Sequence, residues 1–283
     1  MTHQDIFEII SSQYFQLTNS EKKVADYVLG HRTDAQYMSI SELAEECAVA
    51  DATISRFCRR LGLGGYNAFK LELAKASMAA QVFHHPERVV DRDGFLTMCQ
   101  GRLQENVAAL EQTVKRLDPE ALELAADLMF QAGRVLCMGQ GSSMVLAEEA
   151  WSLLSSISPK FVLVPDSHQQ MAALALMEEG DAALYFSYSG STREIQDALE
   201  VAHARKGKVI LITRFPKSPG GLKADVVLQC GSNEGPLQAG SVPARIAQLF
   251  VVDLLYTELF QRAPEQAVEY RERIAEAIAR RHV

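Results

Sequence analysis

Apolar and polar residues follow two different rhythms along the chain, and the first rhythm, over residues 1–78, is helical throughout. In "LTNSEKKVADYVLGH" the apolar positions recur at the spacing of one helix face. Two stretches also carry the capping-box pattern of a helix start: Thr18 with Glu21, and Ser39 with Glu42. The pattern therefore predicts an all-α segment over residues 1–78.

One helix of this segment, predicted from about Asp51 to Leu61, has two contrasting faces. Its inward stripe is apolar and consists of Ile54, Phe57, Cys58 and Leu61. Its outward face centres on Ala52, Arg56 and Arg59, flanked by Thr53, Ser55 and Arg60. Taken alone, this face could be an ordinary solvated basic surface, or it could bind an anionic partner.

The second rhythm begins at about residue 102, after a break in composition over residues 79–101 that we interpret as a linker. Short apolar runs then alternate with helix-length segments. The runs are "RVLCMG", "FVLVP", "AALYFSY", "VILIT" and "VVLQC". Continuous apolar runs of this kind are typical of parallel strands that are buried on both faces. The region 102–283 is therefore predicted to be an α/β domain with helices on both sides of a parallel sheet.

Charge changes this picture only locally. The chain has 283 residues and a net charge of −8, yet residues 51–75 carry five basic side chains against two acidic ones, so the rest of the chain carries −11. Positive charge is thus concentrated on the helical segment, where an anionic polymer could dock.

Other features of the composition exclude several classes of protein. The five cysteines are scattered without a Cys-x-x-Cys pair, which favours reduced thiols over disulfides or a zinc site. The pair His84-His85 has no partners at ligand spacing, so we expect no metal and no cofactor. The chain begins without a signal-peptide pattern and has no apolar run long enough for a membrane span. We therefore expect a cytoplasmic protein.

Two loops rich in glycine and hydroxyl side chains follow predicted strands. The first is Gly139-Gln140-Gly141-Ser142-Ser143, and the second runs from Ser187 to Thr192. Glycine lets a backbone approach an anion closely, and a following helix start offers unpaired N–H groups. The hydroxyls could simply cap the helices. Two such loops on separate strands instead favour a cradle for a phosphate monoester.

These two loops, in this order and separation, resemble the sugar isomerase (SIS) domain, which binds phosphosugars. The stretch "SELAEECAVADATISRFCRRLGLGGYNAFKLEL" is similar to the winged-helix-type helix-turn-helix of RpiR-family transcriptional regulators. Together with "ARIAQLFVVDLLY" near the end, the resemblance covers nearly the whole chain. It implies a helix-turn-helix domain (1–78), a linker (79–101) and an SIS domain (102–283) with a five-stranded parallel sheet, in a homodimer or higher oligomer.

The resemblance also implies a set of ligand-binding residues. By position in the motif, the phosphate donors are Ser187, Ser189 and Thr192, with a further contact from Ser143. Gly141 and Ser142 belong to the first loop, and Ser191 occupies a variable position of the second. Glu234 could accept hydrogen bonds from sugar hydroxyls.

In a helix-turn-helix domain, the 51–61 helix would enter the major groove of DNA. We expect Thr53, Ser55 and Arg56 to contact bases, Arg59 and Arg60 to contact phosphates, and Lys70 to reach the backbone. Family members often have a serine where this chain has Ala50, so the helix cap could fall to Asp51. A two-fold symmetric dimer would bind an inverted repeat.

Two alternatives use the same residues. A phosphosugar isomerase needs a base at the sugar, for which Glu194, Glu234 and His168 are candidates. A dinucleotide-binding protein would use Gly139-x-Gly141 and Asp166, but Met144 replaces the third glycine of that fingerprint and the hydroxyl loop would stay unexplained. A DNA-binding regulator that is controlled by a phosphosugar, and that is not an enzyme, explains most of the pattern.

Overall fold

The computed structural model describes residues 5–82, 92–232, 235, 237 and 240–279. The chain divides into two compact units, one formed by residues 1–101 with 233–239 and the other by residues 102–232 with 240–283. The pair at 84–85 and Glu234 lie outside the described residues. So does part of the predicted linker, whose remaining residues continue α5 (Tyr66–Val82) and begin α6 (Arg92–Arg116).

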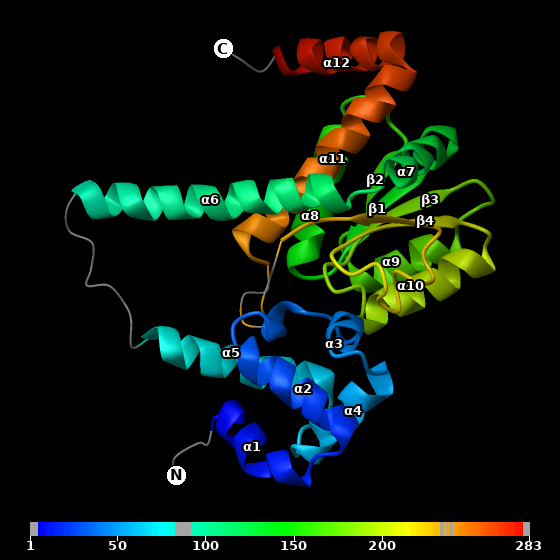
Figure 1. The fold of residues 1–283 in the computed structure, drawn as a ribbon. Coiled ribbons are helices and arrows are strands. Elements are labelled where there is room, and N and C mark those ends of the chain that lie inside the picture. The colour runs from blue at the N-terminus through cyan, green and yellow to red at the C-terminus, as the bar shows by residue number, and fades with distance from the viewer. Residues whose placement is uncertain (1–4, 83–91, 233–234, 236, 238–239, 280–283) are drawn as a thin grey trace. The chain divides into compact units, whose positions relative to one another are not determined.

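The first unit is helical, which confirms the all-α prediction (Figure 1). Besides α5 it contains α1 (Ile6–Gln13), α2 (Asn19–Gly30), α3 (Ile40–Glu46) and α4 (Asp51–Arg60). Residues 5–82 include no strand, and therefore no β-stranded wing. These helices share one apolar core, whose fully buried side chains include Ile10, Val24, Leu43, Ile54, Phe57 and Phe69.

Both predicted capping boxes are present in this unit. The Glu21 backbone N–H donates to Thr18 Oγ1 at 3.4 Å, and the Glu21 carboxylate accepts from the Thr18 N–H at 2.9 Å. Ser39 and Glu42 exchange the same two bonds at 3.1 and 2.8 Å. These bonds satisfy backbone N–H groups that a helix start leaves unpaired, and so fix where α2 and α3 begin.

The second unit contains the predicted five-stranded parallel sheet, with strand order β2-β1-β3-β4-β5. Each strand coincides with one of the five apolar runs: β1 (Val135–Gly139), β2 (Phe161–Leu163), β3 (Ala182–Phe186), β4 (Lys208–Thr213) and β5 (Val226–Gln229). The central strands β1 and β3 are buried along their whole length. Helices therefore cover both faces of the sheet.

Two sets of helices form these covering layers. α7 (Pro119–Gln131), α8 (Ser142–Leu154) and α11 (Val242–Arg262) share a core with one face of the sheet. α9 (Ser167–Ala175) and α10 (Arg193–Ala204) share a separate core with the other face, where the Tyr185 ring lies. Alternate residues of the three middle strands, β1, β3 and β4, supply the two cores, as the pleat of a sheet requires.

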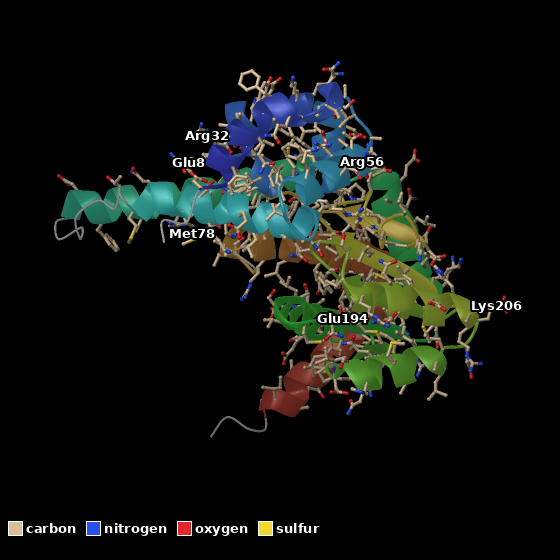
Figure 2. The ribbon with its side chains drawn as sticks, turned by 90° about the horizontal axis from the view of Figure 1, so that it is seen from below. Glu8, Arg32, Arg56, Met78, Glu194 and Lys206 are labelled. Carbon is tan, nitrogen blue, oxygen red and sulfur yellow. The ribbon has the colours of Figure 1, made fainter. Side chains whose placement is uncertain are left out.

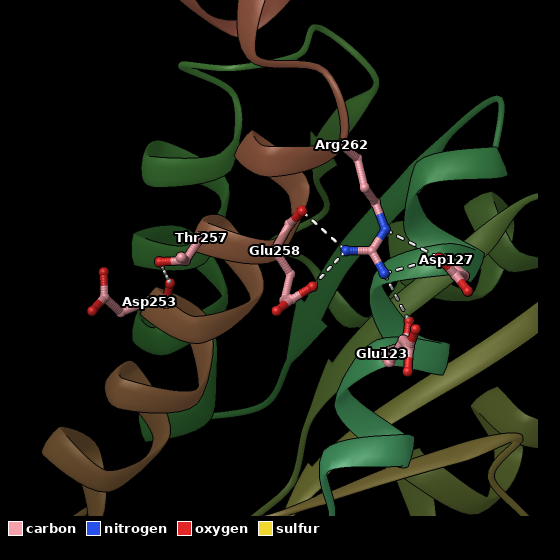
Figure 3. Close-up of polar contacts among 6 residues, drawn as sticks. All are labelled: Glu123, Asp127, Asp253, Thr257, Glu258 and Arg262. Carbon is pink, nitrogen blue, oxygen red and sulfur yellow. Dashed lines mark hydrogen bonds and ion pairs between the residues drawn. The ribbon is translucent and has the colours of Figure 1, made fainter.

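The end of α11 is joined to α7 by a network around Arg262 (Figure 3). Its Nε and Nη2 atoms lie 3.0 and 2.9 Å from Asp127 Oδ1, and Nη1 lies 2.7 Å from Glu258 Oε2. Only 18% of the Arg262 side chain is exposed. The network ties two helices of one layer together immediately before α12 (Pro264–Ala279).

Candidate functional site

The two hydroxyl loops lie side by side at the carboxyl edge of the sheet. β1 and β3 are hydrogen-bonded neighbours, and their last residues, Gly139 and Phe186, are paired in register. The helices that follow these two strands, α8 and α10, lie on opposite faces of the sheet. This is a topological switch point, where open α/β sheets bind their ligands.

The first loop turns sharply into α8. Gly141 is the N-cap of α8 and has φ +55°, a conformation that favours glycine. No side chain caps the helix start. Ser142 and Ser143 open the helix and are half-buried. The loop thus brings two hydroxyls and the N-terminal amides of α8 to the edge of the sheet.

The second loop is held partly by its own hydroxyls. Ser187 is buried, and its Oγ accepts from the Gly190 N–H at 3.2 Å. Gly190 has φ +58°, and a side chain there would overlap the Ser218 hydroxyl. Ser189 Oγ accepts from the Ser191 N–H at 3.3 Å, and the Ser191 hydroxyl donates to the Ser189 carbonyl at 2.9 Å. Ser187 and Ser191 therefore also shape the loop.

Thr192 behaves differently from the serines. It is the N-cap residue of α10, but its side chain makes no capping hydrogen bond, and it is exposed. Capping alone does not explain this hydroxyl, because a capping threonine would accept from an N–H of the first turn. Its position leaves it available to a ligand at the start of α10.

Arg245 is a cation that the sequence analysis missed. It lies in the first turn of α11, and its Nε is buried without a hydrogen-bond partner. Its Nη2 and Ser142 Oγ lie 3.0 and 3.1 Å from the position that a side-chain carbon at Gly240 would occupy. Arg245 therefore stands beside the first loop, and its wide separation in sequence from that loop explains why no local pattern indicated it.

A cavity of about 240 Å³ lies between α9 and α10 and reaches the first loop. Its lining includes two of the three candidate bases, His168 and Glu194, together with Gln140, Gln170 and Asp197. Figure 2 labels Glu194 at the start of α10. The third candidate base, Glu234, lies outside the described residues. Asp166 caps α9 by accepting from the N–H groups of His168 and Gln169, each at 3.0 Å, which gives it a structural role.

A larger cavity, of about 580 Å³, lies at the opposite, amino edge of the sheet. The charged side chains around it are paired with one another: Lys206 with Glu179, and Lys208 and His203 with Asp225, at 2.8 to 2.9 Å. The smaller cavity is the better candidate for a ligand because it adjoins the first hydroxyl loop and the first turn of α10, which follows the second loop.

In the first unit, α3 and α4 form the predicted helix-turn-helix. Ile54, Phe57, Cys58 and Leu61 are all buried, as predicted. Arg56, which Figure 2 labels, and Arg59 are exposed, and Ser55 is half-buried, so this face of α4 is open. Lys70 lies on α5 and is half-buried.

Two features of α4 differ from the sequence-based predictions. Thr53 is only 7% exposed, and its Oγ1 accepts from Arg56 Nη2 at 3.1 Å, so it does not lie on the open face. The helix cap does not fall to Asp51: Ala50 is the N-cap and has no capping side chain, while Asp51 accepts from the Ser41 hydroxyl at 2.8 Å.

Arg60 has a partner within the unit. Its Nε lies 3.0 Å from Glu21 Oε1, and its Nη1 donates to the Gln16 carbonyl at 3.3 Å. Glu21 is 4% exposed. Burial alone would raise the pKa of Glu21, but bonds from Thr18 and Arg60 outweigh it and hold this pKa below its ordinary value.

The described residues contain no cluster of three or more metal-ligating side chains. Within them, no helix has both the length and the apolar composition to cross a membrane. Burial raises the pKa of Cys58 and Cys137 to about 12, so these thiols are protonated and unreactive at neutral pH.

Comparison with family models gives two matches. Residues 4–80 match the helix-turn-helix domain of the rpiR family, and residues 128–258 match the SIS domain. The first match contains α4, and the second contains both hydroxyl loops and the smaller cavity.

Similar proteins extend these matches over nearly the full length. An HTH-type transcriptional regulator of Caldanaerobacter subterraneus subsp. tengcongensis is 31% identical over 279 residues, which are 99% of each chain. The regulator HexR of Escherichia coli is 28% identical over 97% of this chain and 94% of its own. The solved structure of Vibrio vulnificus NanR complexed with ManNAc-6P is 26% identical, has a TM-score of 0.82, and covers 98% of this chain and 99% of that one.

Proposed function

Since the chain belongs to the RpiR family of helix-turn-helix transcriptional regulators, with a C-terminal SIS domain, we propose that a phosphorylated sugar bound at the two hydroxyl loops controls its affinity for DNA. The observation that carries this proposal is the exposed Thr192 hydroxyl, which serves no helix cap, beside a second hydroxyl loop at a switch point of the sheet. The complex of NanR with ManNAc-6P supports the same class of ligand.

The phosphate would be held without a metal. Ser189 and Thr192 would donate hydroxyl hydrogen bonds, joined by Ser142 and Ser143 from the first loop and by amides at the starts of α8 and α10. Ser187 and Ser191 would keep the second loop in shape and add contacts. Arg245, beside Ser142, would supply positive charge.

DNA would be bound by the open face of α4. Arg56 and Ser55 would approach base edges, and Arg59 would contact phosphate. Lys70 would approach the DNA backbone. Thr53 is buried, so its role would be to orient Arg56. Arg60 would mainly stabilise the unit through its ion pair with Glu21. We expect a cytoplasmic dimer or higher oligomer that binds an inverted repeat.

The test begins with an operator selected from random duplexes by the purified protein. Operator affinity is then measured at fixed salt with and without glucose 6-phosphate, glucosamine 6-phosphate and 6-phosphogluconate. We expect at least one of them to change the affinity by roughly tenfold or more, the size of a typical allosteric coupling. Nuclear magnetic resonance of the same sugars tests for turnover. Conversion of a sugar without any effect on DNA binding would favour the isomerase alternative, for which His168 and Glu194 share one cavity.

A further inference from the structure

The cavity between α9 and α10 has a chemical character that restricts the sugar. We propose that it is the subsite for the sugar ring, and that it selects a neutral or amino sugar monophosphate over a phosphorylated sugar acid. This inference rests on the proposed function, because it takes the phosphate to be bound at the hydroxyl loops.

The cavity is lined by a residue of the first loop and by a residue of the first turn of α10. Gln140, which lines it, lies between the two glycines of the first loop, and Glu194, which also lines it, follows Thr192 by two residues. Two residues of chain span at most roughly 7 Å. A hexose phosphate anchored at Thr192 is therefore long enough to place its ring in the cavity.

The amide groups of Gln140 and Gln170, which line the cavity, are held by a hydrogen-bond network. Gln140 Nε2 donates to Gln170 Oε1 at 2.8 Å, and Gln170 Nε2 donates to the carbonyls of Gly139 and Val164 at 2.9 and 2.8 Å. Gln170 is 2% exposed, so this network is fixed in the core. It leaves Gln140 with its Oε1 as an acceptor and with one Nε2–H as a donor.

The carboxylates of Glu194 and Asp197 add further acceptors. Asp197 Oδ2 lies 3.8 Å from the Nε of Arg193, whose side chain is 91% exposed. No lysine or arginine is among the described residues that line the cavity, although Ser167 and His168 do line it and can donate hydrogen bonds. The two carboxylates and the amide oxygens suit the O–H and N–H donors of a hydroxyl-rich or amino sugar.

The Tyr185 hydroxyl lies near two residues that line the cavity, although Tyr185 itself does not line it. Tyr185 is 1% exposed, and its hydroxyl has no partner in hydrogen-bonding geometry. Its polar neighbours, Gln140 and Glu194, both line the cavity. Burial raises the pKa of Tyr185 to about 12, helped by the charge of Glu194 and partly opposed by Gln140, so the group is a neutral donor.

A sugar acid would meet the wrong charge in this cavity. Its carboxylate would lie beside Glu194 and Asp197, and bringing like charges together without a cation is unfavourable. Arg245 does not line the cavity: it belongs to α11, whose core lies on the opposite face of the sheet from that of α9 and α10. Its charge is therefore placed to serve the phosphate end of the ligand.

The test compares three probes by calorimetric titration: glucosamine 6-phosphate, glucose 6-phosphate and 6-phosphogluconate. We expect the first two to bind the unmodified protein at least about tenfold more tightly than the third. Glu194→Gln should lower the affinity for glucosamine 6-phosphate by about 10- to 100-fold, as expected for loss of a hydrogen bond to a charged group. The same substitution should lower the affinity for 6-phosphogluconate less, or raise it.

Glu200→Gln is the matched control, because Glu200 lies on the same helix, is exposed and does not line the cavity. It should leave all three affinities unchanged. A merely structural role of Glu194 would weaken all three probes equally, and that result would overturn the inference, as would preferred binding of 6-phosphogluconate. In both of those cases the proposed function survives, because a phosphosugar still binds. Binding of none of the three would overturn the inference, and failure of a wider set of sugar phosphates would overturn the proposed function with it.

Discussion

Arg56 and Arg60 lie one turn apart on α4, and their guanidinium groups have different surroundings. Arg56 is exposed and donates to the hydroxyl of the neighbouring Thr53, whereas Arg60 is paired with the buried Glu21. We predict that Arg56→Ala weakens operator binding by about 1–3 kcal/mol, the value of a good base contact, and relaxes sequence preference. Fluorescence anisotropy at fixed salt measures both effects, and phosphosugar affinity should not change.

Arg205→Ala is the matched control for this prediction. It removes the same charge from an exposed position in the second unit, after α10. If both substitutions weakened operator binding equally, the effect of Arg56 would be one of net charge, and its assignment to a base contact would be wrong.

Arg60 should matter for stability more than for DNA. We predict that Arg60→Met lowers the free energy of unfolding by about 1–2 kcal/mol, because it leaves the buried Glu21 carboxylate without its cation. The expected loss of stability is smaller than for a fully buried ion pair because 43% of the Arg60 side chain is exposed. Thermal unfolding measures it, and an unchanged melting temperature would contradict the structural role.

The same pair gives a pH dependence with a definite sign. The pKa of Glu21 is lowered in the folded protein, so its contribution to stability is present above its ordinary pKa of 4.5 and is lost as the pH falls below that value. In Arg60→Met the folded-state pKa should rise. Melting temperatures recorded from pH 7 to pH 3 should therefore converge for the two proteins at the acid end, and a constant difference would contradict this linkage.

At the scale of elements, Arg262 joins the end of α11 to α7. We predict that Arg262→Met lowers the free energy of unfolding by about 1–2 kcal/mol, since the guanidinium is mostly buried while its partners are partly exposed. Arg273→Met on α12 is the control. Its pair with Glu269 is 3.9 Å long and largely exposed, so its loss should cost little. Equal losses of stability in the two variants would show that the network in Figure 3 contributes nothing beyond surface charge.

The elements themselves could be predicted well from local sequence. Both capping boxes and all five strands lie where short patterns indicated them, because each is fixed by residues within one turn or one strand. Thr53 was the local failure. Thr53 precedes Phe57 by four residues, so the two side chains lie on the same face of the helix. The spacing therefore indicated that Thr53 is buried, but its polar hydroxyl led to its assignment to the outward face.

The contacts of the candidate site depend on residues that are far apart in sequence. Arg60 and Glu21 are 39 residues apart, and Gln140 and Gln170 are 30 apart. No helical or strand period specifies such pairs. The two hydroxyl loops could be found because each is continuous in sequence, whereas Arg245 and Tyr185 become recognisable only once the sheet and its two helical layers bring them near those loops.

At the scale of the whole molecule, a DNA-binding unit and a ligand-binding unit are joined in one chain. We propose that the hydroxyl loops bind a phosphosugar and that the affinity for DNA responds. Thr192 makes no capping bond, and Ser189 accepts only one long bond of 3.3 Å, so removing both hydroxyls should cost little stability.

The most direct measurement is the operator affinity of the double variant Ser189→Ala, Thr192→Ala, with and without the phosphosugar to which the unmodified protein responds. We predict that, without the sugar, the double variant binds the operator as tightly as the unmodified protein does. Its melting temperature should be nearly unchanged, and its operator affinity should not respond to the sugar. Loss of two hydrogen bonds to a charged phosphate should lower the affinity for the phosphosugar by about two to four powers of ten. A full response to the sugar at its original concentration, in a variant with a clearly lowered melting temperature, would contradict the account and assign these hydroxyls to the stability of the loop.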